Sequence, residues 1–127
     1  MLYEIRTKKT LQQVATALEA AAQKYKFGVL AMHDLKARMK EKGVEFDRDC
    51  LIYEVCNPHQ AKKVLEANPE ISSALPCRIS IYADNGGFAL ATLRPTALIG
   101  VFATPALQSV AQEVEDVILK MMEEAAR

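Results

Sequence analysis

Tryptophan is absent from this 127-residue chain, and aromatic residues make up only 6% of it. Proteins that bind single-stranded nucleic acid without sequence preference stack the bases on aromatic rings, so the scarcity of rings argues against that class of function. Excess charge of either sign is also absent, because 16 basic residues balance 16 acidic ones. A chain with zero formal net charge lacks the positive field of a typical nucleic-acid-binding protein, and no nucleic-acid partner is expected.

The sequence also lacks a long hydrophobic run. Its longest stretch without a charged residue extends from Pro95 to Gln112, and Pro95, Gly100 and Pro105 interrupt it. A membrane-spanning helix needs about 20 consecutive apolar residues, so no membrane partner is expected. The first six residues, Met1–Arg6, meet charge too early to form the apolar core of a secretory signal. These features predict a cytoplasmic protein.

The chain has few cysteine residues, and their number is odd. Three cysteines cannot close into a complete set of disulfide bonds within one chain. Free thiols are therefore expected, as is usual in a reducing compartment, and most free cysteines in proteins are simply buried.

Hydrophobic residues, by contrast, make up half of the chain, enough for a core without disulfides or metals, and the length predicts one domain over residues 1–127. Alternating apolar and polar residues predict five strands, at 2–6, 28–33, 49–56, 77–82 and 88–93. Apolar residues spaced by three and four predict helices that begin after Thr10, Asp34, Asn57 and Thr104. Segment 96–103 is ambiguous, and an irregular or partly helical conformation is favoured there.

This element order predicts the fold class. It reads strand, helix, strand, short helix, strand, helix, strand, strand, helix, which is typical of an α+β domain. The expected architecture is a mixed β-sheet of about five strands, with the helices packed on one face.

One predicted helix has a basic surface. Lys36, Arg38, Lys40 and Lys42 surround the narrow apolar stripe of the short helix after Asp34. A phosphate-binding face would explain these charges. A solvent-exposed amphipathic helix is the preferred interpretation, since basic residues near the C-terminal end of a helix interact favourably with its dipole.

The stretch from Cys56 to Leu65 joins a predicted strand to a predicted helix. Asn57 suits the N-cap and Pro58 the first helical position. Cys56 and His59 also have the spacing of half a metal site, to which Cys77 could add a third ligand. Such a site requires both cysteines at one sheet edge. The length of the connection favours a crossover between parallel strands, which would separate them by ~20 Å, so a joint site is not expected.

Two short motifs, Glu54-Val-Cys-Asn-Pro58 and Leu75-Pro-Cys-Arg78, stand before and after this helix. With the capped first helix and the amphipathic last helix, they make the chain similar to the domain of unknown function 302 family over nearly its whole length. The resemblance implies a compact α+β fold that usually stands alone as a small domain. It implies no activity.

Sequence motifs of catalysis are missing. The chain has no GxSxG or HExxH motif and no nucleotide-binding glycine loop, so no catalytic residue, metal site or cofactor is assigned. The sequence favours a non-catalytic module that binds a small apolar or anionic ligand between the sheet and the helices, and it leaves a homodimer open. The candidate ligand-binding residues are Cys56, Asn57, His59, Cys77 and Arg78.

The role of one segment and an alternative function are left undecided by the sequence. The uncharged segment from Pro95 to Gln112 could line a ligand pocket or a subunit interface, or it could be a buried connection. The alternative function is thiol-based redox chemistry or metal binding centred on Cys56 and Cys77.

Overall fold

The computed structural model describes residues 1–127 and contains one five-stranded β-sheet. Its strands lie in the order β1-β5-β4-β3-β2, and every neighbouring pair is antiparallel. The strands are β1 (Leu2–Thr7), β2 (Gly28–Asp34), β3 (Cys50–Cys56), β4 (Cys77–Asp84) and β5 (Gly87–Leu93). The α+β class and the five strands are thus confirmed, whereas the sheet is fully antiparallel instead of mixed.

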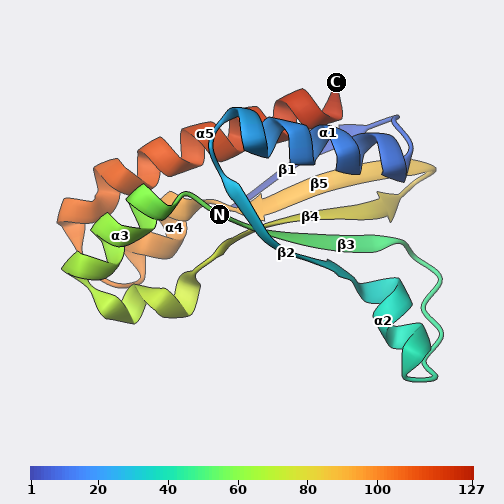
Figure 1. Ribbon diagram of the computed structural model, residues 1–127, viewed down its shortest axis with the longest axis horizontal. Helices are drawn as coiled ribbons and strands as arrows, with labels where there is room; N and C mark the ends of the chain where they lie inside the picture. The colour runs from blue at the N-terminus through green and yellow to red at the C-terminus, as the bar shows by residue number, and fades with distance from the viewer.

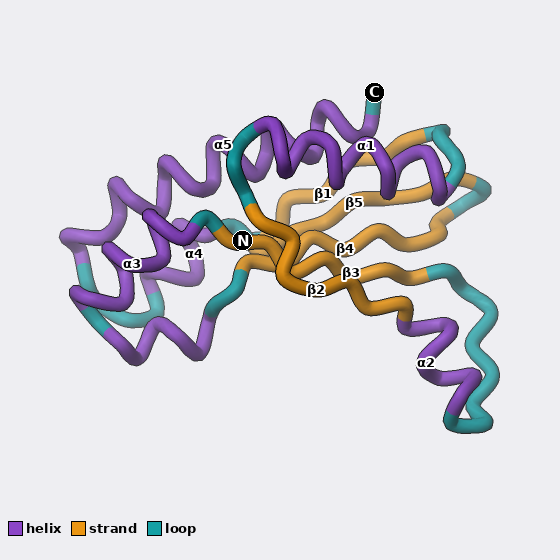
Figure 2. Tube along the Cα trace, viewed as in Figure 1, coloured by secondary structure: helices purple, strands orange, loops and turns teal.

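Helices lie at three places around the sheet. The long helices α1 and α5 run side by side over one face of the sheet, and α3 and α4 lie with the first half of α5 beyond one end (Figure 1). The short α2 projects at the opposite end, as the coloured trace also shows (Figure 2). The helices are α1 (Leu11–Lys24), α2 (Leu35–Glu41), α3 (Pro58–Ala67), α4 (Pro95–Gly100) and α5 (Gln108–Ala126), with 3-10 turns η1 (Pro69–Ala74) and η2 (Pro105–Leu107).

Side-chain caps begin helices α1 and α3. Thr10 and Gln13 form a reciprocal capping box at the start of α1, with bonds of 3.2 and 3.0 Å. Asn57 caps α3, where its Oδ1 accepts from the backbone N–H groups of His59 and Gln60. The ambiguous segment after β5 is helical, since it contains α4.

Two apolar clusters make up the interior. The larger one fills the space between the sheet and helices α1 and α5, with Leu18, Tyr53, Ile81 and Met121 among its fully buried members. A smaller cluster joins α3, η1, α4 and the start of α5 at the end of the sheet, and it consists of Val64, Ile71, Ile99, Leu107 and Ala111. The opposite sheet face carries no helix (Figure 1).

The connection from β3 to β4 differs from the prediction. A crossover between parallel strands was expected, but β3 and β4 pair antiparallel, with Val55 opposite Cys77 and Glu54 opposite Arg78. The cause lies in the second half of the connection. Asn68 caps η1 as Asn57 caps α3, so the connection consists of two short helical segments. The chain thus returns to the end of the sheet at which β3 ends, and β4 begins there. No helix of the chain has the length and apolar character needed to cross a membrane.

Candidate binding cavity

A cavity of about 60 Å³ lies where the two apolar clusters meet. Eleven of its 14 lining residues are hydrophobic, and none is cationic. The lining comes from the residue before β2, the end of β3, α3 with its N-cap, η1 with the residue after it, the start of β4, α4 and α5. It consists of Phe27, Val55, Cys56, Asn57, Gln60, Ala61, Val64, Ile71, Leu75, Cys77, Pro95, Ile99, Ala111 and Val114.

The end of β3 and the first turns of α3 form one side of the cavity. The cap at Asn57 fixes the angle at which α3 leaves the strand, because one side-chain oxygen binds two N–H groups of the first turn. Helical spacing then places Gln60, Ala61 and Val64 along the cavity. The local fold of the Cys56–Leu65 stretch therefore positions these lining residues.

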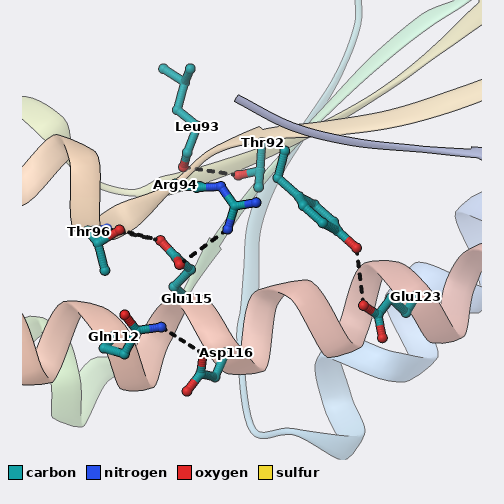
Figure 3. A network of polar contacts seen from close by, with 9 residues as sticks. Thr92, Leu93, Arg94, Thr96, Gln112, Glu115, Asp116 and Glu123 are labelled. Carbon is teal, nitrogen blue, oxygen red and sulfur yellow. Dashed lines mark hydrogen bonds and ion pairs between the residues drawn. The ribbon is translucent and has the colours of Figure 1, made fainter. Parts of the chain in front are cut away.

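The buried carboxylate of Glu115 holds α4 against α5 on the other side. Its Oε1 accepts hydrogen bonds from the hydroxyl of Thr96 at 2.7 Å and from the backbone N–H of Thr96 at 3.2 Å (Figure 3). Its Oε2 lies 3.4 Å from the guanidinium of Arg94. Glu115 is only 5% exposed, so these contacts replace the water that a buried charge loses. They fix the helix that supplies Pro95 and Ile99 to the cavity.

The two cysteines of the cavity are poor nucleophiles. Burial raises the pKa of Cys56 above its ordinary value of 9.0. Burial, followed by the nearby Cys56 thiol, raises the pKa of Cys77 to about 11, despite the opposing effect of Arg78. Both side chains are therefore neutral thiols near pH 7. A helix N-terminus can lower the pKa of a thiol, but the pKa of Cys56 is shifted upward, and burial is the cause.

The structure brings only part of the predicted site together. Cys56, Asn57 and Cys77 line the cavity, whereas His59 is exposed on the surface of α3 and does not contribute to the lining. Arg78 lies on the helix-free face of the sheet, where its guanidinium is 3.6 Å from Glu54. The separation of Arg78 from Cys77 follows from the alternation of side chains along a strand.

Comparison with known proteins identifies the family. The family model for the domain of unknown function DUF302 matches residues 3–125. The chain belongs to the DUF302 family. Its fold is similar to the crystal structure of an uncharacterised conserved DUF302 protein from Bacillus stearothermophilus, with a TM-score of 0.93, 29% identity, and coverage of 99% of this chain and 98% of that chain. No curated protein matches it.

Most lining residues of this DUF302 domain were not predicted as site residues. Ala61 and Val64 were interpreted as the inner face of the helix after Asn57, and nothing in their pattern distinguishes a cavity wall from a packed core. One signal did point to the cavity. The uncharged segment from Pro95 to Gln112 was expected to line a pocket, an interface or a buried connection, and it supplies Pro95, Ile99 and Ala111.

The DUF302 domain has no convergent metal-ligand set. No group of three or more His, Cys, Asp or Glu side chains is arranged to hold a metal ion. His33 and Arg78 both approach Glu54 on the open sheet face, with Nε2 of His33 3.5 Å from Oε1 of the carboxylate. In the basic helix α2, the ammonium of Lys36 lies 3.4 Å from Asp49. The Arg78–Glu54 and Lys36–Asp49 contacts are ion pairs between partly exposed side chains.

Proposed function

We propose that this DUF302 domain is a non-catalytic module that binds a small apolar ligand in the cavity between α3, α4 and α5. The observation that carries the proposal is the lining, in which hydrophobic side chains from six helices, turns and strands surround the open space. Ligand sites in proteins are mostly apolar hollows with a few polar groups, so an apolar hollow of this kind is a candidate binding site. The absence of a cationic lining residue favours an apolar ligand over an anionic one.

The size of the cavity limits the ligand. An engineered apolar cavity of about 150 Å³ holds benzene or xenon, whereas this cavity has a volume of about 60 Å³. A ring does not fit unless the walls move. A group of two to four non-hydrogen atoms fits, either as a whole molecule or as the end of a longer chain.

Thiol chemistry is the weaker candidate. A reactive thiol needs a lowered pKa, because the thiolate is the nucleophile and the metal ligand. The pKa values of Cys50, Cys56 and Cys77 are all raised, with burial as the largest cause in each case. The side chains that would act in redox or metal chemistry are therefore kept in their unreactive form.

Xenon is a suitable probe for the proposed cavity. In methyl-detected NMR under xenon pressure, we expect saturable shifts for the methyl groups of Val64, Ile71 and Ile99. The substitution Ala61→Leu adds side-chain volume to the cavity wall and should abolish these shifts. Ala20→Leu makes the same change at an exposed position of α1 and should leave them intact. Xenon shifts that persist in Ala61→Leu, or that never saturate, would count against the cavity as a binding site.

A homodimer is the proposed assembly, with the β2 edge as its surface. β2 is an edge strand, and none of the backbone hydrogen bonds outside regular elements involves its residues. Val29, Leu30 and Met32 are exposed by 42%, 61% and 47%. Edge strands are normally protected by charged side chains, but none occurs between Lys26 and Asp34. Antiparallel pairing of two copies would bring the cationic end of each strand toward the anionic end of the other.

A further inference from the structure

Helix α3 is only lightly anchored to the rest of the domain. Val64 is its one buried residue, whereas α1 has five buried residues and α5 has six. The inner face of α3 lies over the cavity, because Gln60, Ala61 and Val64 all belong to the lining. Side chains that face a void lose the attractive contacts of close packing. Segments with few buried apolar contacts open locally at a low cost in free energy, so α3 is a weakly held wall of the cavity.

One side-chain hydrogen bond joins α3 to α5. Nε2 of Gln60 donates to Oε2 of Glu113 at 3.1 Å, and no other side chain of α3 forms a hydrogen bond or an ion pair with another element. Gln60 and Val114, the neighbour of Glu113, both line the cavity. The cap at Asn57 lies at the junction with β3 and makes no bond to α5. The bond to Glu113 therefore fastens α3 to α5 next to the cavity.

The same amide group has an unpaired atom. Oε1 of Gln60 is buried without a hydrogen-bond partner, and it is the one buried side-chain nitrogen or oxygen of the chain in this condition. A carboxylate only accepts hydrogen bonds, so Glu113 cannot pair with this oxygen in place of the amide nitrogen. An unpaired buried acceptor costs about as much free energy as one hydrogen bond to a charged group contributes. The bond at Nε2 is thus offset by the loss of water at Oε1.

We propose that α3 is a lid of the cavity, which the Gln60–Glu113 hydrogen bond holds closed and which the unpaired oxygen of Gln60 favours to open. When α3 separates from α5, both ends of the amide return to water. This inference rests on the proposed function and adds how a ligand enters and how large it is. A cavity of about 150 Å³ holds benzene, whereas the closed cavity has about 60 Å³. Opening of α3 supplies the missing space, so the ligand class includes apolar molecules the size of a ring.

Amide hydrogen exchange measures the opening of α3 without any ligand. Glu113→Ala removes the acceptor of the bond and leaves Oε1 of Gln60 buried and unpaired. Gln60→Met removes the bond together with the unpaired oxygen, and it keeps a flexible side chain of similar length. Asp116→Ala is the matched control, because it removes an amide–carboxylate bond of 2.9 Å, from Gln112, that stays within α5.

The two partners of the bond should give different results. In Glu113→Ala, the amide protons of α3 should exchange about tenfold faster than in the wild type, the fold-change that corresponds to one hydrogen bond. In Gln60→Met they should exchange no faster than in the wild type, since the cost of the unpaired oxygen disappears with the bond. Asp116→Ala should match the wild type, and exchange in α1 should be the same in all four forms.

Benzene binding should follow the same opening. A titration by methyl-detected NMR, read at Val64 and Ile99, should show tighter binding of benzene to Glu113→Ala than to the wild type. Asp116→Ala and Gln60→Met should show no such gain. Benzene that binds no tighter to Glu113→Ala would contradict the proposed size of the ligand.

Other results would overturn the lid itself. The inference is wrong if the amide protons of α3 exchange as slowly as those of α1 in the wild type. It is also wrong if Gln60→Met and Glu113→Ala accelerate exchange equally, as the two partners of an ordinary hydrogen bond would. If xenon does not bind the wild type while the exchange pattern holds, the proposed function fails and the opening of α3 is supported.

Discussion

Cys56 ends β3 at the same sheet edge where Cys77 begins β4, and both side chains line one cavity. Their proximity results from the antiparallel pairing of the two strands and from the return of the chain through α3 and η1. Two cysteines this close together could be taken for a redox pair, but the reactivity of a thiol also depends on its pKa. Burial raises the pKa of both thiols, so the pair acts here as part of an apolar wall.

The raised pKa of Cys77 predicts a specific loss of stability at alkaline pH. The folded-state pKa of about 11 lies above the ordinary value of 9.0, so the folded chain keeps this proton where the unfolded chain releases it. The resulting stabilisation is complete below about pH 9 and is lost as the pH rises toward 11. Urea unfolding at a series of pH values should show this decline in the wild type. Cys77→Ala should flatten it, and an identical decline in the variant would contradict the assignment.

Native thiol reactivity should be low for the same reason. Near pH 7, both cavity cysteines should react with a chromogenic disulfide reagent more slowly than free cysteine does, and the rate should rise with pH as the thiolate forms. Cys56→Ala and Cys77→Ala variants identify which thiol reacts. Fast reaction of Cys56 in the folded protein would favour the thiol alternative over ligand binding.

Truncation at Ile71 should enlarge the cavity. Ile71 is 1% exposed and belongs to both the lining and the smaller cluster. Ile71→Ala is expected to lower the free energy of unfolding by about 2–5 kcal/mol and to admit a larger probe such as benzene. Ile118→Ala is the matched control in the larger cluster, where the cost should be similar without any gain in benzene binding at the cavity. Equal benzene binding by both variants would show that benzene does not bind at this cavity.

The contacts of Glu115 should stabilise the wall formed by α4. Glu115→Ala leaves the hydroxyl and backbone N–H of Thr96 without their acceptor and is expected to cost about 1–3 kcal/mol in urea unfolding. Asp116→Ala, on the exposed side of the same helix, should change stability by less than about 0.5 kcal/mol. Equal effects of the two substitutions would show that the buried contacts do not hold α4.

The proposed dimer predicts concentration-dependent mass. Leu30→Lys places a charge in the middle of the exposed β2 edge and should shift the protein toward the monomer in sedimentation equilibrium. Val101→Lys changes the most exposed large hydrophobic residue, at the end of α4, and should have no effect. A wild-type protein that remains monomeric at the highest concentration would rule out pairing through β2.

Sequence reasoning predicted the elements of this fold well because their signals are local. The capping box at Thr10 and Gln13, the N-cap at Asn57 and the alternation along β3 depend on neighbouring residues alone. The turn between β4 and β5 depends on local residues in the same way, since Asn85 and Gly86 have the positive φ values that a tight hairpin requires.

The direction of β4 relative to β3 was not predictable in the same way. A helix between two strands is compatible with a crossover and with a return. The length of the 20-residue connection between Cys56 and Cys77 was taken to favour the crossover, and that prediction is wrong. The cavity was missed for a related reason. A void forms where the side chains of several elements do not completely fill the space between them. Residues such as Ala61 and Val64 would look the same in sequence if they were fully packed.

Crystals held under xenon pressure give the most direct test of the cavity as a ligand site. We predict xenon density between Val64, Ile99 and Val114 in the wild type, and no density there in isomorphous crystals of Ala61→Leu. The absence of xenon from this cavity in the wild type, or its presence only on the open face of the sheet, would contradict the proposed function.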